Sequence, residues 1–308
     1  MSVAVASHSF PKHQTLRREL EERYPDAVYN LTGRPLIGAD LIRFLRRHEK
    51  AITGLEVLDD AVFSAVPELR IVSKYGVGLD MIDLDAATRC GVSVRWTPGV
   101  NRQAVAELAI AFMLVLGRDT VTLARELRDG GWHQPGGRQL SSATVGIVGC
   151  GDIGQQVARL SAAFGARILA HDIRVYDAFY RELGVTPFSL DALLAEADFV
   201  TIHVPLDAST RGLVGAREIA RMKRTAFLVN TARGGIVDEE ALKAALVDGR
   251  LAGAACDVYA IEPPVDRELL QLPNFVGTPH IGGSTEEAAL AMGRAAITGL
   301  DDPARQIP

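Results

Sequence analysis

Three ionisable residues in the second half of the sequence each follow a short apolar run that predicts a β-strand. Arg233 comes shortly after FLVN, Glu262 after AACDVYA and His280 after FVGT. Because open α/β sheets bind ligands at the carboxyl ends of their strands, we expect these side chains to gather at one edge of a sheet. Taken singly, each is more typical of a structural role: an ion pair, a turn cap and a hinge histidine, respectively.

Together, these residue types match the needs of hydride transfer between a nicotinamide and a 2-oxo acid. Histidine titrates near neutrality and is suited to give a proton to the new hydroxyl group. An adjacent glutamate favours the protonated imidazolium. Arginine binds a carboxylate in bidentate fashion and stabilises negative charge on the carbonyl oxygen. We therefore predict that Arg233, Glu262 and His280 are catalytic, with Arg233 also binding the substrate.

A glycine-rich turn lies in the segment VGIVGCGDIGQQVARLSAAFGARILAHD, residues 145–172. Its order is strand, glycine turn, helix, second strand and acid, which is the context of a dinucleotide-binding motif. Gly149 permits the turn, Gly151 lets the backbone approach a pyrophosphate, and Gly154 allows close packing of helix and strand. The helix N-terminus attracts phosphates, and Asp172 is placed to accept both ribose hydroxyls. The alternative is a βαβ unit with an empty turn.

Asp172 also bears on the choice of cofactor. A carboxylate at the end of the second strand repels a 2′-phosphate, which favours NAD over NADP. Arg174 is a mild counter-signal, because a nearby arginine accommodates that phosphate, but a solvated loop charge is the simpler interpretation. We predict NAD.

Composition narrows the class of protein. The chain has 308 residues and a formal net charge of −5 that is spread along it without a basic stripe, so nucleic acid is not an expected partner. Charges interrupt every apolar segment well short of a membrane span, and the N-terminus lacks a secretory signal. Cys90, Cys150 and Cys256 are widely spaced without metal-ligand spacing, as expected of small buried side chains in a reducing compartment. We expect a cytoplasmic α/β protein with no metal and no membrane partner.

Short apolar runs alternate with helical patterns, which predicts parallel sheets with helical crossovers in two domains. Residues 101–127 are interpreted as one long apolar helix that bridges domains or meets another subunit. A helix over 284–300 is expected to return to the first domain. The predicted strands are 3–6, 51–53, 71–74, 145–148, 168–171, 199–202, 227–230 and 253–256, and predicted helices include 59–66, 83–90, 155–164 and 239–248.

Over essentially its whole length the chain resembles the D-isomer-specific 2-hydroxyacid dehydrogenases, in the branch similar to phosphoglycerate dehydrogenase. Several motifs in the same order make this resemblance specific. The matching segments are SKYGVGLDMIDL (73–84), TPGVNRQAVAELA (97–109), GIVGCGDIGQQVA (146–158), HVPLDASTRGLV (203–214), LVNTARGGIVDEEAL (228–242), DVYAIEPP (257–264) and TPHIGGSTEEA (278–288).

The resemblance implies an architecture and roles for residues. It implies two doubly wound parallel-sheet domains, with a Rossmann NAD domain (99–280) inserted in a flavodoxin-like substrate domain (1–98 with 281–308). The site is expected between them, the helix near 101–127 is expected to be the family's dimer element, and we expect a short form without the C-terminal regulatory domain of some relatives. The backbone of Gly76, Val77 and Gly78 is expected to bind the substrate carboxylate. Residues expected to line the NAD site are Asp152, Ile153, Asp172, His203, Thr231, Ala232, Asp257, His280, Ile281, Gly282 and Gly283, together with the glycine turn.

Two departures from the family pattern affect the substrate prediction. Trp96 stands where the family often has asparagine, and either reshapes the site or packs. After the strand at 51–53, where phosphoglycerate-oxidising relatives place arginines, this chain has Gly54, Leu55 and Glu56. Lys74 and Arg102 are the nearest basic candidates, although a surface charge and a helix terminus are simpler roles for them. We therefore expect small unphosphorylated 2-oxo acids, such as glyoxylate or hydroxypyruvate, to be preferred over 3-phosphohydroxypyruvate.

Other functions remain open at this point. The family fold also occurs in NADH-sensing corepressor-like interaction proteins, which keep the same three residues. A true 3-phosphoglycerate dehydrogenase is a second alternative. Formate dehydrogenases are disfavoured, because that branch pairs its histidine with glutamine where this chain has Glu262.

Overall fold

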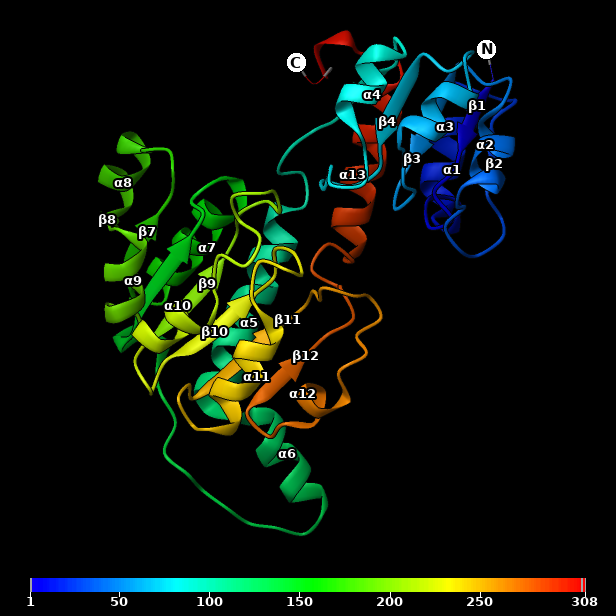
Figure 1. The fold of residues 1–308 in the computed structure, drawn as a ribbon. Coiled ribbons are helices and arrows are strands. Elements are labelled where there is room, and N and C mark those ends of the chain that lie inside the picture. The colour runs from blue at the N-terminus through cyan, green and yellow to red at the C-terminus, as the bar shows by residue number, and fades with distance from the viewer. Residues whose placement is uncertain (1, 306, 308) are drawn as a thin grey trace. The chain divides into compact units, whose positions relative to one another are not determined.

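The computed structural model describes residues 2–305 and 307, which form two compact units. The first unit comprises Met1–Asn101 and Thr285–Pro308, and the second comprises Arg102–Ser284. The divisions predicted from the sequence, after residues 98 and 280, lie within a few residues of these. Figure 1 shows a sheet flanked by helices in each unit.

The first unit contains a five-stranded parallel sheet in the order β2-β1-β3-β4-β5. This is the flavodoxin-like order, in which strand addition reverses between β1 and β3. The strands are β1 Val3–Val5, β2 Val28–Tyr29, β3 Lys50–Thr53, β4 Ile71–Lys74 and β5 Ser93–Arg95. The helices are α1 Gln14–Glu21, α2 Ala39–Leu45, α3 Asp60–Ala65, α4 Leu84–Arg89 and α13 Glu286–Gly299, with 3-10 turns at Phe10–Lys12 and Pro303–Arg305.

Helices cover both faces of this sheet, because successive strand residues point to opposite sides. Ala4 and Ala51 pack with α2, α3 and α4 on one face, whereas Val5 and Ile52 pack with α1 and α13 on the other. The hydroxyl of Ser73 in β4 donates a 2.7 Å hydrogen bond to the Ala296 carbonyl in α13. The C-terminal helix thus completes the core of the first unit.

The second unit contains a seven-stranded parallel sheet in the order β12-β11-β10-β9-β6-β7-β8. This is a Rossmann order extended by one strand, with its reversal between β6 and β9. The strands are β6 Thr144–Val148, β7 Arg167–His171, β8 Thr186–Pro187, β9 Phe199–Ile202, β10 Phe227–Asn230, β11 Gly253–Cys256 and β12 Phe275–Gly277. The helices are α5 Arg102–Arg118, α6 Thr120–Arg128, α7 Asp152–Ala163, α8 Asp177–Leu183, α9 Leu190–Glu196, α10 Ala216–Arg221, α11 Glu239–Val247 and α12 Arg267–Gln271, with a 3-10 turn at Leu140–Ser142.

This second sheet is also buried on both faces. Phe112 of α5 and Val157 of α7 belong to the apolar cluster on one face, and Leu193 of α9 and Leu242 of α11 belong to the cluster on the other. A parallel sheet covered on both sides requires nearly continuous apolar strands, which explains why these runs were readable in the sequence.

The prediction of one long helix over 101–127 is wrong. The segment forms two helices, α5 and α6, separated at Asp119, whose φ of +50° lies in the left-handed region. That conformation cannot continue a right-handed helix. Helix α5 owes its apolar character to burial within its own unit, whereas α6 has no buried residue; Leu127 and the nearby Trp132 are 59% and 80% exposed.

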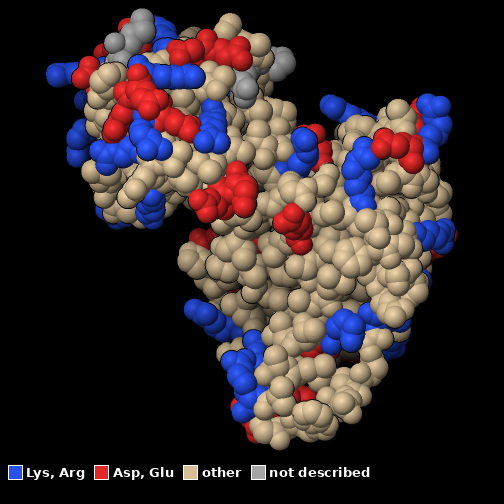
Figure 2. All heavy atoms as spheres, turned by 180° about the vertical axis from the view of Figure 1, so that it is seen from behind, with Lys and Arg blue, Asp and Glu red and all other residues tan. Residues whose placement is uncertain are grey.

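Surface charge, cysteines and membrane propensity complete the description. On the face drawn in Figure 2, basic and acidic side chains are interspersed over both units. Cys90, Cys150 and Cys256 are free thiols, and burial raises the pKa of Cys150 to about 11, which makes it a poor nucleophile. Among the described residues, no helix is long and apolar enough to span a membrane, and no group of three His, Cys, Asp or Glu side chains is arranged to hold a metal ion.

Candidate active site

Three neighbouring strands of the second unit carry the predicted catalytic residues at their carboxyl ends. Arg233 follows β10, Glu262 lies in the loop between β11 and α12, and His280 follows β12. Glu262 Oε2 lies 2.8 Å from His280 Nδ1. Their side chains are 38% and 41% exposed, so the pair is accessible to a ligand. The structure thus brings Glu262 and His280, two of the three residues singled out in the sequence, into contact.

The His280 turn is built by Asp257. The backbone N–H of His280 donates to the Asp257 carbonyl at 2.8 Å, and the buried Asp257 carboxylate accepts from Thr278 Oγ1 at 2.5 Å and from the amides of Ile281 and Gly282, both at 2.7 Å. His280 has a φ of +54°, a left-handed conformation that is uncommon for a non-glycine residue and costs about 1 kcal/mol or more. Asp257 therefore holds the strained backbone that presents the histidine, a role the sequence did not reveal.

Glu262 has a defined orientation as well. Its Oε1 accepts a 3.1 Å hydrogen bond from the Tyr259 amide while Oε2 contacts the histidine. Because the carboxylate engages Nδ1, the second ring nitrogen of His280, Nε2, is the one left to face a substrate.

The Arg233 loop is held at its base by Asn230. The side-chain NH₂ group of Asn230 donates to the Arg233 carbonyl at 2.9 Å, and Asn230 Oδ1 accepts from the backbone N–H of Ala232 at 3.1 Å. The Arg233 guanidinium is half-buried and donates to the Ala232 carbonyl at 2.8 Å. A Cβ on Gly234 would overlap the Tyr259 carbonyl, so the loops that carry Arg233 and Glu262 touch backbone to backbone. This close approach requires a glycine at position 234.

The glycine turn after β6 has the shape of a phosphate cradle. Gly149 has a φ of +92°, and a Cβ there would lie 2.7 Å from the backbone of His203. A Cβ on Gly154 would overlap the Gly149 carbonyl, whereas nothing lies within 4 Å of a Cβ on Gly151. Gly151 is the N-cap of α7, and no side chain caps that helix, so its first amides are available to an anion.

Asp172 lies just beyond the end of β7 and faces the same turn. Its Oδ2 accepts from the Cys150 amide at 2.6 Å and its Oδ1 from the Arg174 amide at 2.8 Å. A carboxylate has about four acceptor positions, so Asp172 keeps capacity for ribose hydroxyls. The Arg174 side chain is exposed.

Two further residues predicted near the cofactor have unpartnered buried atoms. Thr231 is 6% exposed, and its hydroxyl has no hydrogen-bond partner among the described residues, a situation that costs about 1–3 kcal/mol for a buried polar group. The His203 ring contacts Thr201 Oγ1 at 2.9 Å, and its buried Nδ1 has no partner within the part of the chain that the structure describes. Burial lowers the pKa of His203 to about 3, so the ring stays neutral. The remaining predicted residues lie at the start of α7 (Asp152, Ile153), after β10 (Ala232) and after β12 (Ile281, Gly282, Gly283). This set fits a dinucleotide.

The predicted carboxylate loop, Gly76-Val77-Gly78, belongs to the first unit and follows β4. Gly76 has a φ of +130°, and the Trp96 indole N–H donates to the Val77 carbonyl at 2.8 Å. Because the C=O and N–H of a trans peptide point in opposite directions, this bond directs the Gly78 N–H away from Trp96. Trp96 thus orients the loop, a contact that the sequence left undecided.

The simple interpretation of Lys74 as a surface charge is wrong. Lys74 is 4% exposed, and its ammonium contacts the Gly54 carbonyl and, at 3.0 Å, Met81 Sδ. Glu56 is 1% exposed and accepts from the Gly54 amide at 2.6 Å. Lys74 and Glu56 are therefore both buried, and they bind the carbonyl and the backbone N–H of Gly54, respectively. Arg102 is the exposed first residue of α5.

Comparison with known proteins agrees with this geometry. Residues 110–282 match the family model described as "D-isomer specific 2-hydroxyacid dehydrogenase, NAD binding domain". The chain is 42% identical to a hydroxypyruvate reductase from Thermotoga maritima over 75% of this chain and 76% of that protein. It is 43% identical to a D-3-phosphoglycerate dehydrogenase from Mycobacterium tuberculosis over 77% of this chain but 45% of the relative. The crystal structure of TT0316 protein from Thermus thermophilus superposes with a TM-score of 0.87 at 35% identity, covering 100% of both chains.

Proposed function

The chain belongs to the D-isomer-specific 2-hydroxyacid dehydrogenase family and is an NAD-dependent 2-hydroxyacid dehydrogenase, and on this premise we propose that it interconverts a small D-2-hydroxy acid and its 2-oxo acid. The observation that carries the proposal is the 2.8 Å contact between Glu262 and His280. NAD, when bound, supplies or accepts the hydride at C2 of the substrate.

The proton is handled by His280. In the reductive direction its Nε2 gives a proton to the carbonyl oxygen, and in the oxidative direction it takes the hydroxyl proton. Glu262 contacts Nδ1 of His280 and thereby fixes the orientation of the ring. Arg233 binds the substrate carboxylate and stabilises negative charge on the carbonyl oxygen.

The cofactor is proposed to lie along the carboxyl ends of the second unit's strands. The turn from Gly149 to Gly154 and the uncapped amides of α7 bind the pyrophosphate, and Asp172 accepts the ribose hydroxyls. We include the buried Thr231 hydroxyl among the proposed cofactor contacts because it has no hydrogen-bond partner among the described residues. The first unit is proposed to be the substrate domain, with the amides of Gly76-Val77-Gly78 binding the carboxylate.

The proposed substrate class is small and unphosphorylated, with hydroxypyruvate and glyoxylate as the leading candidates. The segment after β3 offers no arginine, and its charged side chain, Glu56, is buried and engaged by Gly54. A dianionic phosphate next to that carboxylate would be repelled. The hydroxypyruvate reductase from T. maritima is consistent with this choice. A role as a 3-phosphoglycerate dehydrogenase is the alternative.

Assembly and location are also proposals. We propose a homodimer through α6 and the loop that follows it, because α6 buries nothing in its own unit and Leu127 and Trp132 are exposed apolar side chains. The free thiols support a reducing compartment, and we propose the cytoplasm.

A panel of 2-oxo acids assayed with NADH by loss of absorbance tests the function. Hydroxypyruvate or glyoxylate should give a higher kcat/KM than 3-phosphohydroxypyruvate, and His280→Asn protein prepared in parallel should be nearly inactive. A clear preference for the phosphorylated acid would favour the alternative function, a 3-phosphoglycerate dehydrogenase. Tight NADH binding without turnover of any acid would favour a sensor.

A further inference from the structure

The loop that carries Glu262, residues 257–266, has little apolar anchorage at its tip. Ile261 and Val265 are 62% and 71% exposed, and Ala260 through Pro263 form an exposed run. An exposed loop whose side chains do not pack must be held by polar contacts if one of its residues is to meet a partner at a fixed distance. The residues that make those polar contacts therefore bear on how Glu262 is placed for catalysis.

Two residues of α11 supply them. Glu239 Oε1 accepts a 2.6 Å hydrogen bond from the Ala260 amide, and Lys243 Nζ lies 2.7 Å from Asp266 Oδ2. Glu239 and Lys243 are four residues apart on one helix and so share a face. Their two anchor points, Ala260 and Asp266, bracket Glu262 along the chain.

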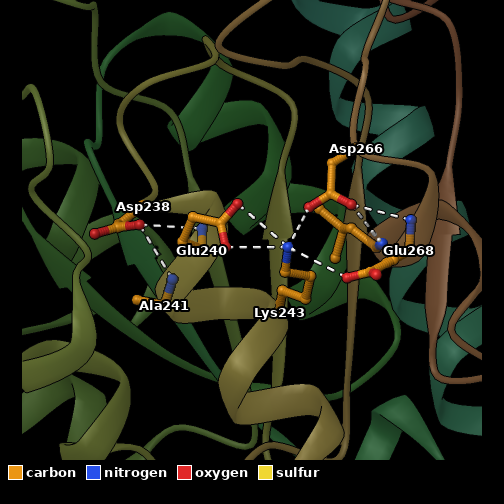
Figure 3. Close-up of polar contacts among 7 residues, drawn as sticks. Asp238, Glu240, Ala241, Lys243, Asp266 and Glu268 are labelled. Atoms are coloured by element: carbon orange, nitrogen blue, oxygen red, sulfur yellow. Dashed lines mark hydrogen bonds and ion pairs between the residues drawn. The ribbon is translucent and has the colours of Figure 1, made fainter.

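The Lys243 anchor belongs to a wider network. Figure 3 shows Lys243 between Glu240 on one side and Asp266 with Glu268 on the other, at 3.0 Å from Glu240 Oε2 and 3.8 Å from Glu268 Oε2. Asp266 Oδ1 at the same time caps α12 through the amides of Glu268 and Leu269. The lysine thus ties the end of the Glu262 loop and the start of α12 to α11.

This network stays charged at working pH. The hydrogen bonds that Lys243 donates to Asp266 and Glu240 raise the pKa of Lys243, and the bond from Lys243 lowers the pKa of the Asp266 carboxyl. With about a fifth of each side chain exposed, the ion pair is partly shielded from solvent and is worth more than a fully exposed pair.

We propose that Glu239 and Lys243 are positioning residues for the acid–base pair, holding the Glu262 loop so that its carboxylate meets His280. The inference rests on the proposed role of Glu262. It places the control of the Glu262–His280 contact on α11, which carries neither residue of the pair.

The test compares pH profiles of reduction for matched variants. Glu262→Gln should shift the pH profile of kcat, because a neutral amide then replaces the carboxylate that contacts Nδ1 of His280. Lys243→Met should move it in the same direction by a smaller amount and lower kcat about tenfold, since displacement of a catalytic group by about 1 Å costs up to 100-fold. Affinity for NADH should not change. Lys243→Arg should restore most of the activity, because arginine still reaches Asp266.

Glu239 provides an independent arm that does not depend on the folding of the Lys243 variant. Glu239→Ala removes the acceptor for the Ala260 amide and should lower kcat and shift the profile. Glu239→Gln keeps an oxygen acceptor and should behave like wild type. Lys223→Met is the matched control, because it breaks a 3.0 Å ion pair with Asp198 away from this loop.

The outcomes distinguish the proposed acid–base pair from the proposed positioning role of α11. If Glu262→Gln leaves the pH profile unchanged, the proposed acid–base pair itself is wrong. If Glu262→Gln shifts the profile but Lys243→Met and Glu239→Ala behave like Lys223→Met, the pair stands and the positioning role of α11 is overturned.

Discussion

Asp257 holds the turn at His280 with two groups. Its backbone carbonyl binds His280, and its side-chain carboxylate binds the two residues that follow His280. The His280 amide donates to the Asp257 carbonyl at 2.8 Å, and the Asp257 carboxylate accepts the amides of Ile281 and Gly282 at 2.7 Å each. The turn that presents the histidine is therefore folded around a single buried carboxylate, which is 1% exposed.

Asp257→Asn should destabilise this turn. The asparagine side chain has one acceptor oxygen, whereas the carboxylate has two. At least one of the donors from Thr278, Ile281 and Gly282 is therefore left facing an NH₂ group. A buried unsatisfied donor costs about 1–3 kcal/mol, and we expect a loss of about 2 kcal/mol in the free energy of unfolding. Urea denaturation of both proteins measures it. An unchanged midpoint would mean that the turn holds without the carboxylate.

His280→Asn should abolish most turnover without removing the cofactor. Proton transfer by a positioned group contributes about 100- to 10,000-fold, and asparagine tolerates the left-handed conformation found here, with a φ of +54°. The backbone of the turn should therefore survive. Steady-state kcat and NADH affinity by fluorescence titration check both parts. Near-normal turnover in this variant would refute the assigned proton donor.

The sequence revealed the parts of this molecule that depend on local pattern. Buried parallel strands such as β9 and β10 appear as short, mostly apolar runs, and the glycine turn has its own spacing. The edge strands β2, β5 and β8 were not predicted, because strands of two or three residues, most of them not buried, carry no periodicity.

Contacts between distant parts of the chain were not readable from the sequence. Nothing in the pattern around Trp96 indicates that its indole reaches Val77, because the parallel pairing of β4 and β5 creates that proximity. The same is true of Asp257 and the turn after β12, and of the burial of Lys74. The break at Asp119 was missed because a single left-handed residue leaves the apolar composition of its helix unchanged.

Asp172→Ala should narrow the preference for NADH over NADPH. The wild-type carboxylate lies beyond β7, and each of its oxygens accepts a hydrogen bond, from the backbone N–H groups of Cys150 and Arg174. On the proposed cofactor position, it should repel a 2′-phosphate. Its removal should change the ratio of kcat/KM values for the two cofactors by about tenfold, equivalent to about 1.4 kcal/mol. Measuring both cofactors with both proteins decides it. A wild-type enzyme that already prefers NADPH would show that Arg174 or a neighbour dominates.

Trp96→Phe should weaken the binding of 2-oxo acids while sparing the cofactor. Phenylalanine keeps an aromatic ring but lacks the N–H that donates to the Val77 carbonyl at 2.8 Å, so the peptide bearing the Gly78 amide loses its fixed orientation. A lost neutral hydrogen bond is worth about 1 kcal/mol, which predicts a rise of about fivefold in KM for the acid and no change in NADH affinity. The unmodified enzyme, prepared in parallel, is the reference. Saturation kinetics with hydroxypyruvate compare the two proteins. A KM for the acid equal to that of the wild-type enzyme would show that the loop does not need the indole, and that the substrate carboxylate is held by Arg233 without help from Trp96.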